Sequence, residues 1–390
     1  SIIAENCKVG DNVTLGFGQE KPNVLNESIY SFGLVTIGED SVIPDGVKIG
    51  KNTAISGVTY EEDYKDGVLE GGEVIIKAGV AVLTQYNARS LNEHLSSAKW
   101  WNFGRKQGGL FLFTPTVTAD NSDWYRGTAD AMYQNIDFLK RRHEPYVIIS
   151  SGDCVYKLDF NRVLDFHIEK KSDITVVCKD MMYNDDVSRF GVVRMDDESR
   201  ITEFDEKPIE ASSNTISTGI YVIRRRQLIE LLEAAAEENR FDFVNDILVR
   251  YKNVKKIYGY KINSYWNNIA DIDAYFKTNM DFLRPDIRSY FFREEPTICS
   301  KVDDLPPAKF NPGSDISNSL VSSGCIINGS VEDSVLFKQV FVGKNTTVKN
   351  CVILNDVYIG DNVHLENCIV ESRGTINPNT CYCGEDGVMI

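Results

Sequence analysis

Two stretches of this chain place an apolar residue at every sixth position, a spacing that few folds can use. In an ordinary strand successive side chains point to opposite faces, so a half-buried strand gives a period of two. A period of six is typical of a left-handed β-helix, in which short strands and turns repeat around a narrow apolar core. In the first stretch the predicted inward positions are Ile37, Ile43, Ile49 and Ile55, followed four residues later by Ser41, Val47, Thr53 and Thr59.

The same spacing returns near the C-terminus, with one five-residue step between Val348 and Ile353. We expect Gly343 and Gly360 to lie where each coil turns sharply, because glycine adopts backbone angles that a Cβ forbids. The predicted inward positions here are Val342, Val348, Ile353, Ile359 and Leu365, with a second set at Thr346, Val352, Val357, Val363 and Ile369.

Between the repeats the chain alternates strand-like and helix-like segments. This alternation predicts an α/β domain with a mostly parallel sheet and helices on both faces. We therefore divide the chain into a β-helix fragment with a tail (1–79), an α/β domain (80–290) and a C-terminal β-helix domain (291–390). The predicted strands are 80–86, 146–151, 173–178, 219–223 and 255–262, and the predicted helices are 128–142, 161–171 and 226–239.

Charge and hydropathy narrow the classes of function. The net charge of −15 argues against a broad nucleic-acid surface, because backbone phosphates are bound by clustered lysines and arginines. The short basic run at 140–142 fits a helix C-terminus better than a phosphate site. The sequence has no apolar run of about 18 residues, as a membrane helix requires, and its first residues lack the layout of a signal peptide. These features predict a cytoplasmic protein.

The nine cysteines are spread along the chain, as expected for small buried hydrophobes in a reducing compartment. Cys381 and Cys383 form a Cys-x-Cys pair with no second pair and no histidine next to it in the sequence. We therefore do not expect a zinc site there.

Three segments of the middle domain have features suited to phosphoryl chemistry. Gly127-Thr128 precedes a helix whose N-terminal amides would favour a nucleotide phosphate, although Thr128 also fits a plain N-cap. Asp153 follows a predicted strand, where it would either cap a loop or bind magnesium. Glu206-Lys207 offers a carboxylate beside a cation, and Ser217 follows shortly after it. Taken singly, such charges are most often solvated surface groups.

In this order the segments resemble the ADP-glucose pyrophosphorylase (glucose-1-phosphate adenylyltransferase) family. The similarity covers the chain from Val80 onward. It rests on residues 124–134, 151–159, 188–191, 204–208, 217–221, 265–266 and 318–336. It implies an incomplete Rossmann-like nucleotidyltransferase domain followed by a left-handed parallel β-helix, acting in glycogen biosynthesis. It further implies nucleotide binding by Gly127, Thr128 and Gln134, a magnesium ion on Asp153, and glucose 1-phosphate binding by Glu206, Lys207 and Ser217.

The sequence departs from this family at the positions that matter most for turnover. Nothing matches the family's Gly-Gly-x-Gly-x-Arg-Leu loop. The nearest glycine pair, Gly71-Gly72, is followed by the acidic Glu73 and by no further loop glycine. The family's Trp-Arg/Lys-Asp-Val-Gly pattern reads Trp266-Asn-Asn268-Ile-Ala, so Asn268 replaces the second metal-binding carboxylate, and Cys154 replaces a histidine. Two unit charges about 4 Å apart attract each other by roughly 4 kcal/mol at an effective dielectric of 20, so the missing carboxylate removes a metal interaction of about that size. We therefore expect turnover about a thousandfold lower than with the carboxylate present.

These departures resemble the regulatory (GlgD-type) subunit of the family. The resemblance implies a weakened magnesium site, possible substrates ATP and glucose 1-phosphate, and a catalytic subunit as partner in a hetero-oligomer, with a tetramer as the expected assembly. Residues 1–79 resemble the closing coils of a catalytic subunit, which suggests a fragment or a fusion. If that join is real, the middle sheet exposes an edge and we expect poor stability.

Two other functions fit parts of the sequence. The first is a competent glucose-1-phosphate adenylyltransferase, in which this chain alone would form ADP-glucose. The missing loop and Asn268 argue against it. A hexapeptide acyltransferase would use the β-helix surface and a catalytic histidine, for which His364 is the one candidate in either repeat. The acyltransferase leaves the middle domain unexplained, and a single histidine on a coil is usually a surface residue.

Overall fold

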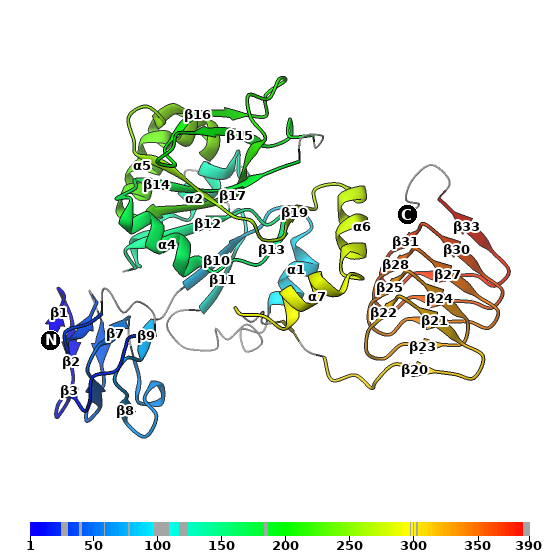
Figure 1. Ribbon diagram of the computed structural model, residues 1–390, viewed down its shortest axis with the longest axis horizontal. Helices are drawn as coiled ribbons and strands as arrows, with labels where there is room; N and C mark the ends of the chain where they lie inside the picture. The colour runs from blue at the N-terminus through cyan, green and yellow to red at the C-terminus, as the bar shows by residue number, and fades with distance from the viewer. Residues whose placement is uncertain are drawn as a thin grey trace. The chain divides into compact units, whose positions relative to one another are not determined.

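A computed structural model of the chain divides into two compact units. One comprises residues 1–150 and 160–262, and the other comprises 151–159 and 263–390. The helices and strands of both units carry the labels of Figure 1. The structure describes all residues except 25–29, 39–40, 58, 77–78, 97–108, 117–123, 143, 183–185, 297, 299, 302 and 385–390.

The N-terminal repeat forms β-helical coils built from short parallel strands. Three stacks of strands follow one another around each coil, and Ile37 pairs with Ile55 one coil later. All eight predicted inward residues are buried, which confirms the six-residue pattern. The strands are β1 (Ile2–Ile3), β4 (Val35–Ile37), β7 (Thr53–Ser56) and β9 (Val74–Ile76) in one stack, β2 (Lys8–Val9) and β5 (Val42–Ile43) in the second, and β3 (Thr14–Phe17), β6 (Lys48–Gly50) and β8 (Val68–Leu69) in the third.

The C-terminal repeat is a left-handed parallel β-helix, visible as the ladder of strands β20 to β33 in Figure 1. Its last three coils are 17 residues long, because Ser330 pairs with Thr347, Thr347 with His364, and His364 with Cys381. The first stack is β20 (Lys309–Phe310), β23 (Ile326–Ile327), β26 (Phe341–Val342), β29 (Tyr358–Ile359) and β32 (Thr375–Ile376). The second is β21 (Asp315–Ser317), β24 (Ser330–Glu332), β27 (Thr347–Lys349), β30 (His364–Glu366) and β33 (Cys381–Cys383), and the third is β22 (Leu320–Val321), β25 (Val335–Leu336), β28 (Val352–Ile353) and β31 (Ile369–Val370).

All ten predicted inward residues of this β-helix are buried, but its glycines have a different role from the one expected. Neither Gly343 nor Gly360 has a left-handed backbone angle, and such angles at the turns fall most often on asparagines, including Asn345, Asn362 and Asn379. Their side chains form a ladder, in which the Asn362 amide donates to Asn379 at 3.0 Å. Gly343 is needed for space, because an added Cβ would lie 2.4 Å from the backbone of Gly360. The expectation that Gly343 and Gly360 provide special turn angles was therefore wrong.

The α/β part is centred on a sheet of six strands with β17 in the middle. β14 and β18 pair in parallel, whereas β17 is antiparallel to β14, β12 and β15, and β15 is antiparallel to β16. The prediction of a mostly parallel sheet was wrong, because the long strand β17 runs opposite to its neighbours. The strands are β12 (Tyr146–Ser150), β14 (Ile174–Asp180), β15 (Gly191–Met195), β16 (Ile201–Glu206), β17 (Thr215–Arg224) and β18 (Ile257–Lys261).

Helices cover both faces of this sheet, as the alternation along β14 demonstrates. Ile174 and Val176 belong to the same buried cluster as Leu228 and Leu232, which come from the helix on one face. Thr175 lies between them and points to the other face, where its hydroxyl is hydrogen-bonded to His167 on a second helix. The predicted helix 128–142 is broken at Asn135, whose side-chain amide donates to the Ala131 carbonyl oxygen. The helices are α1 (Ala88–Leu95), α2 (Thr128–Gln134), α3 (Ile136–Lys140), α4 (Phe160–Glu169) and α5 (Arg225–Glu237), with a π-helical segment at Val244–Val249 and a separate parallel pair of strands, β10 (Gly79–Leu83) and β11 (Gly109–Phe113).

The second unit adds a short α/β segment to the C-terminal β-helix. Strands β13 (Cys154–Tyr156) and β19 (Trp266–Asn268) pair antiparallel, and helices α6 (Ile272–Asp281) and α7 (Pro285–Phe292) follow. The Lys157 ammonium donates to the carbonyl oxygens of Tyr290 and Glu294, which fixes residues 151–159 to α7. Within the described part of the chain, every helix is too short or too polar to cross a bilayer.

His167 on α4 makes the stability of the first unit depend on pH. Burial and the nearby Arg224 lower its pKa from 6.5 to about 4, and its Nε2 atom is buried without a hydrogen-bond partner. The unfolded chain therefore binds a proton that the folded chain rejects, and stability falls as the pH decreases from 6.5 towards 4. We expect a loss on the order of 2–3 kcal/mol, measured as the free energy of unfolding in urea. His167→Gln should flatten this slope, whereas replacing the exposed His94 should leave it intact.

Candidate functional site

The N-terminus of α2 is closed by a neighbouring loop of the same unit. The backbone amides of Ala129 and Asp130 donate to the Phe241 carbonyl oxygen at 2.8 and 3.2 Å, and the Thr128 hydroxyl accepts the Phe243 amide at 2.9 Å. A Cβ on Gly127 would lie 2.4 Å from the same Phe241 oxygen. The glycine is thus required by close backbone contact, and two of the helix's free amides are already occupied.

A buried carboxylate on α2 ties Gln134, an expected site residue, to Arg126. The Asp130 side chain is only 1% exposed, and it accepts hydrogen bonds from the Arg126 guanidinium at 3.0 Å and from the Gln134 amide at 2.9 Å. Burial alone would raise the pKa of Asp130, but the bonds from Arg126 and Gln134 lower it overall. Arg126 also stacks on the Phe241 ring, with 3.8 Å between its central carbon and the ring centroid. Gln134 is therefore held by Asp130.

Glu206 ends β16 and Lys207 follows it, whereas Ser217 lies on β17, with β15 between these two strands. Burial raises the pKa of the Glu206 carboxyl, Lys207 counteracts this, and the Asp242 carboxylate raises it further. The Ser217 and Tyr221 hydroxyls are 3.3 Å apart, and burial raises the pKa of Tyr221 well above its usual range. These groups form a half-buried polar patch in which Glu206 and Asp242 repel each other.

The turn at 240–243 connects this patch with the start of α2. Its form is fixed by Asp246, whose carboxylate accepts the backbone amides of Phe241 and Asp242 at 3.0 and 2.9 Å. The Tyr221 and Phe243 rings are also in contact, with centroids 5.2 Å apart. Sequence reasoning missed Arg126, Asp130 and this turn. An acidic residue four positions after another, at Asp242 and Asp246, was the available signal for a side-chain cap.

Asp153 and Asn268 lie side by side in the second unit, because Cys154 at the start of β13 pairs with Asn268 at the end of β19. The Asp153 carboxylate accepts hydrogen bonds from the Ser151 hydroxyl and, at 3.3 Å, from the Cys154 thiol. Burial would raise the pKa of Asp153, but these bonds and one from Asn268 lower it overall. Burial and Asp153 raise the pKa of the Cys154 thiol to about 12.

Asn268 presents the wrong end of its amide for metal binding. Its carbonyl oxygen accepts the Ala270 amide at 3.0 Å, and its nitrogen lies 3.8 Å from the Cys154 sulfur on the side that faces Asp153. Rotating the Asn268 side-chain amide to exchange its oxygen and nitrogen would place its N–H group against the Ala270 backbone N–H. Magnesium requires oxygen ligands in a nearly octahedral arrangement. One carboxylate and one N–H donor fit such a site poorly.

Comparison with known proteins matches two segments of the chain. The nucleotidyl transferase family matches residues 73–284, and the GlmU-like C-terminal hexapeptide family matches residues 306–388. The sheet with its helices, followed by a hexapeptide β-helix, agrees with these matches and places the chain in the nucleotidyl transferase family.

Curated relatives narrow the class. A glucose-1-phosphate adenylyltransferase of Pseudothermotoga lettingae is 38% identical over 272 residues, which are 69% of this chain and 64% of the relative. The enzyme of Thermosipho africanus is 37% identical over 313 residues, or 77% of this chain and 76% of the relative. That of Bacillus subtilis is 34% identical over 314 residues, or 77% of this chain and 82% of the relative. The chain belongs to the glucose-1-phosphate adenylyltransferase family.

The pair of Arg126 and Asp130 allows a direct test of the α2 network. Arg126→Met would leave a buried carboxylate without its cation, and we expect the free energy of unfolding in urea to fall by about 2–3 kcal/mol. This is less than the usual loss for a broken buried ion pair, because the Arg126 side chain is 46% exposed. Arg89 and Glu93 form the same i,i+4 pair on the surface of α1, with side chains 92% and 62% exposed. Arg89→Met should cost less than about 0.5 kcal/mol in the same urea titration. Equal losses in the two variants would contradict the assigned role of Asp130.

Proposed function

We propose that this chain is a regulatory, weakly catalytic or non-catalytic subunit that supports the synthesis of ADP-glucose from ATP and glucose 1-phosphate by a catalytic subunit. The proposal rests mainly on Asn268, which lies at the position of the family's second metal-binding carboxylate. Its oxygen is engaged by the Ala270 amide and its nitrogen faces Asp153. A magnesium ion would therefore find one carboxylate, Asp153, where the chemistry needs two.

The remaining ligand residues support binding more than turnover. We assign the nucleotide to Gly127, Thr128 and Gln134, and the sugar phosphate to Glu206, Lys207 and Ser217. The amides of Ala129 and Asp130 are occupied by the Phe241 carbonyl oxygen, and Gln134 donates to Asp130. A nucleotide would have to compete with these bonds, so we expect weak binding. Glucose 1-phosphate bound at Lys207 would share that cation with Glu206, and its phosphate would add negative charge near Glu206 and Asp242.

The outer surface of the C-terminal β-helix offers a contact for the catalytic partner. Along the first stack, apolar side chains point outward on successive strands, at Ile326, Phe341 and Tyr358. The Phe341 and Tyr358 rings are stacked, with centroids 4.9 Å apart and an angle of 6° between their planes. Such a strip is suited to subunit association. We propose a hetero-oligomer, with a tetramer as the expected assembly, and a division of the chain at 79/80 and 290/291.

Activity assays on the isolated chain and on a mixture test this function. The purified chain with ATP, glucose 1-phosphate and Mg²⁺ should release pyrophosphate about a thousandfold more slowly than a catalytic relative, since each factor of ten reflects about 1.4 kcal/mol of lost stabilisation. Added to a catalytic subunit, it should change that subunit's rate or its response to substrates. Rapid ADP-glucose formation by the chain alone would instead identify a competent enzyme.

Restoring the missing carboxylate tests the metal argument separately. Asn268→Asp should raise Mn²⁺ or Mg²⁺ affinity by at least about tenfold, because a carboxylate replaces an N–H donor beside Asp153. Asn267→Asp is the matched control, with the same change in charge one residue away. The Asn267 amide instead donates to the Thr278 hydroxyl at 3.0 Å. Paramagnetic resonance of Mn²⁺ would measure both affinities, and an equal gain in the two variants would point to net charge and not to the site.

A further inference from the structure

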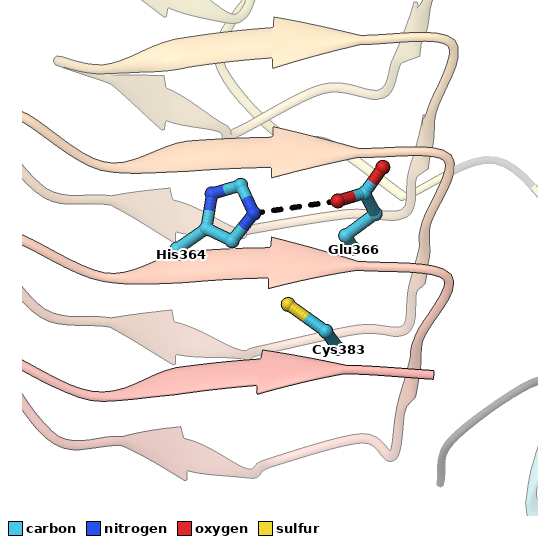
Figure 2. A group of neighbouring side chains, drawn as sticks. All are labelled: His364, Glu366 and Cys383. Atoms are coloured by element: carbon cyan, nitrogen blue, oxygen red, sulfur yellow. Dashed lines mark ion pairs between the residues drawn. The ribbon is translucent and has the colours of Figure 1, made fainter. Parts of the chain in front are cut away.

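The last two coils of the C-terminal β-helix bring together four side chains that ligate metals. In β30 the buried Leu365 points into the core, so His364 and Glu366 on either side of it point outward. The parallel register sets His364 beside Cys381 and Glu366 beside Cys383. Four potential ligands of three types therefore lie on neighbouring strands of one outer face. Figure 2 shows His364, Glu366 and Cys383 directed towards one another.

The distances among these groups match a single small metal ion. The His364 Nε2 and Glu366 Oε2 atoms are 3.5 Å apart. With one ligand atom taken from each residue, His364, Glu366 and Cys383 all lie within 4.8 Å of one another. The sulfurs of Cys381 and Cys383 are 3.6 Å apart. In a tetrahedral zinc site, bonds of about 2.1 Å to nitrogen or oxygen separate two ligands by roughly 3.4 Å, and bonds of about 2.3 Å to sulfur separate two sulfurs by roughly 3.8 Å.

We propose that His364, Glu366 and Cys383 bind a zinc ion, with Cys381 as the fourth ligand after a rotation of its side chain. Two thiolates, an imidazole and a carboxylate form a donor set that favours zinc over hard cations such as magnesium. The partly exposed outer face gives the ion access. This site corrects the expectation that Cys381 and Cys383 have no histidine near them, since His364 lies one coil away.

The nearby cation does not block the site. Lys349 precedes Glu366 in the same stack of strands, but its ammonium pairs with Glu332 in the opposite direction at 3.5 Å. The Glu366 carboxylate is left facing His364. The ion would link β30 to β33 through side chains as well as through backbone hydrogen bonds. It would thus hold the final coil, where Tyr382 is still 41% exposed, against the coil before it.

Cobalt substitution in the full-length chain tests the site without an activity assay. The chain would be freed of metal with a chelator, kept reduced, and titrated with Co²⁺ and then Zn²⁺. We expect one Co²⁺ per chain, with the visible bands of tetrahedral cobalt and a thiolate charge-transfer band, both abolished by Zn²⁺ and unaffected by Mg²⁺. Zn²⁺ should also raise the melting temperature of the chain. Failure to bind Co²⁺ or Zn²⁺ would overturn the proposal.

Paired variants assign the ligands. Cys383→Ser and His364→Asn should each lower zinc affinity by at least about tenfold, the equivalent of one lost interaction of about 1.4 kcal/mol. Cys7→Ser and His94→Asn, which change a half-buried thiol and an exposed histidine elsewhere, should bind zinc like the parent chain. Cys381→Ser should weaken the thiolate band, and an unchanged band would remove Cys381 from the ligand set. Affinity retained in both Cys383→Ser and His364→Asn would refute the site.

Discussion

The parallel register of the C-terminal β-helix determines most of what its residues can do. Because the last three coils are 17 residues long, each side chain lies beside the residue 17 positions away. Inward positions stack valines and isoleucines into a continuous core, and turn positions stack asparagines whose amides bond along the column. Outward positions stack whatever the sequence supplies, which in the final coils is His364 above Cys381 and Glu366 above Cys383.

In the nucleotidyl transferase part, a single backbone hydrogen bond determines how the side chain of Asn268 is oriented beside Asp153. The Ala270 amide donates to the Asn268 carbonyl oxygen and so decides which end of that amide faces Asp153. An aspartate at this position would offer an acceptor to a cation, whereas the asparagine offers a donor to the carboxylate. Asp153 is consequently hydrogen-bonded by Ser151, Cys154 and Asn268, and protein groups take the place that metal would need. This local arrangement is the physical basis of the proposed regulatory role.

The sequence predicted the parts of the fold that depend on periodicity. A six-residue spacing has one structural interpretation, so every predicted inward residue of both β-helical segments is buried. Strand direction carries no comparable local signal, and the antiparallel course of β17 was missed for that reason. The role of Gly343 was also misread, because its need for space comes from Gly360, which lies on the next coil. The zinc ligands could have been found, since a five-residue step between six-residue repeats implies a 17-residue coil.

The turn at 240–243 gives the first unit a means of coupling its two proposed ligand regions. The Phe241 carbonyl oxygen holds the amides of α2, while Asp242 acts on Glu206 and Phe243 packs on Tyr221. Asp246 fixes Phe241 and Asp242 through one carboxylate cap, and the Phe243 amide donates to the Thr128 hydroxyl. A ligand that displaced Phe241 from α2 would therefore also shift Asp242 relative to Glu206, and so change the charge that a sugar phosphate meets. Such coupling needs no catalysis, because it depends only on two ligand regions sharing one rigid turn.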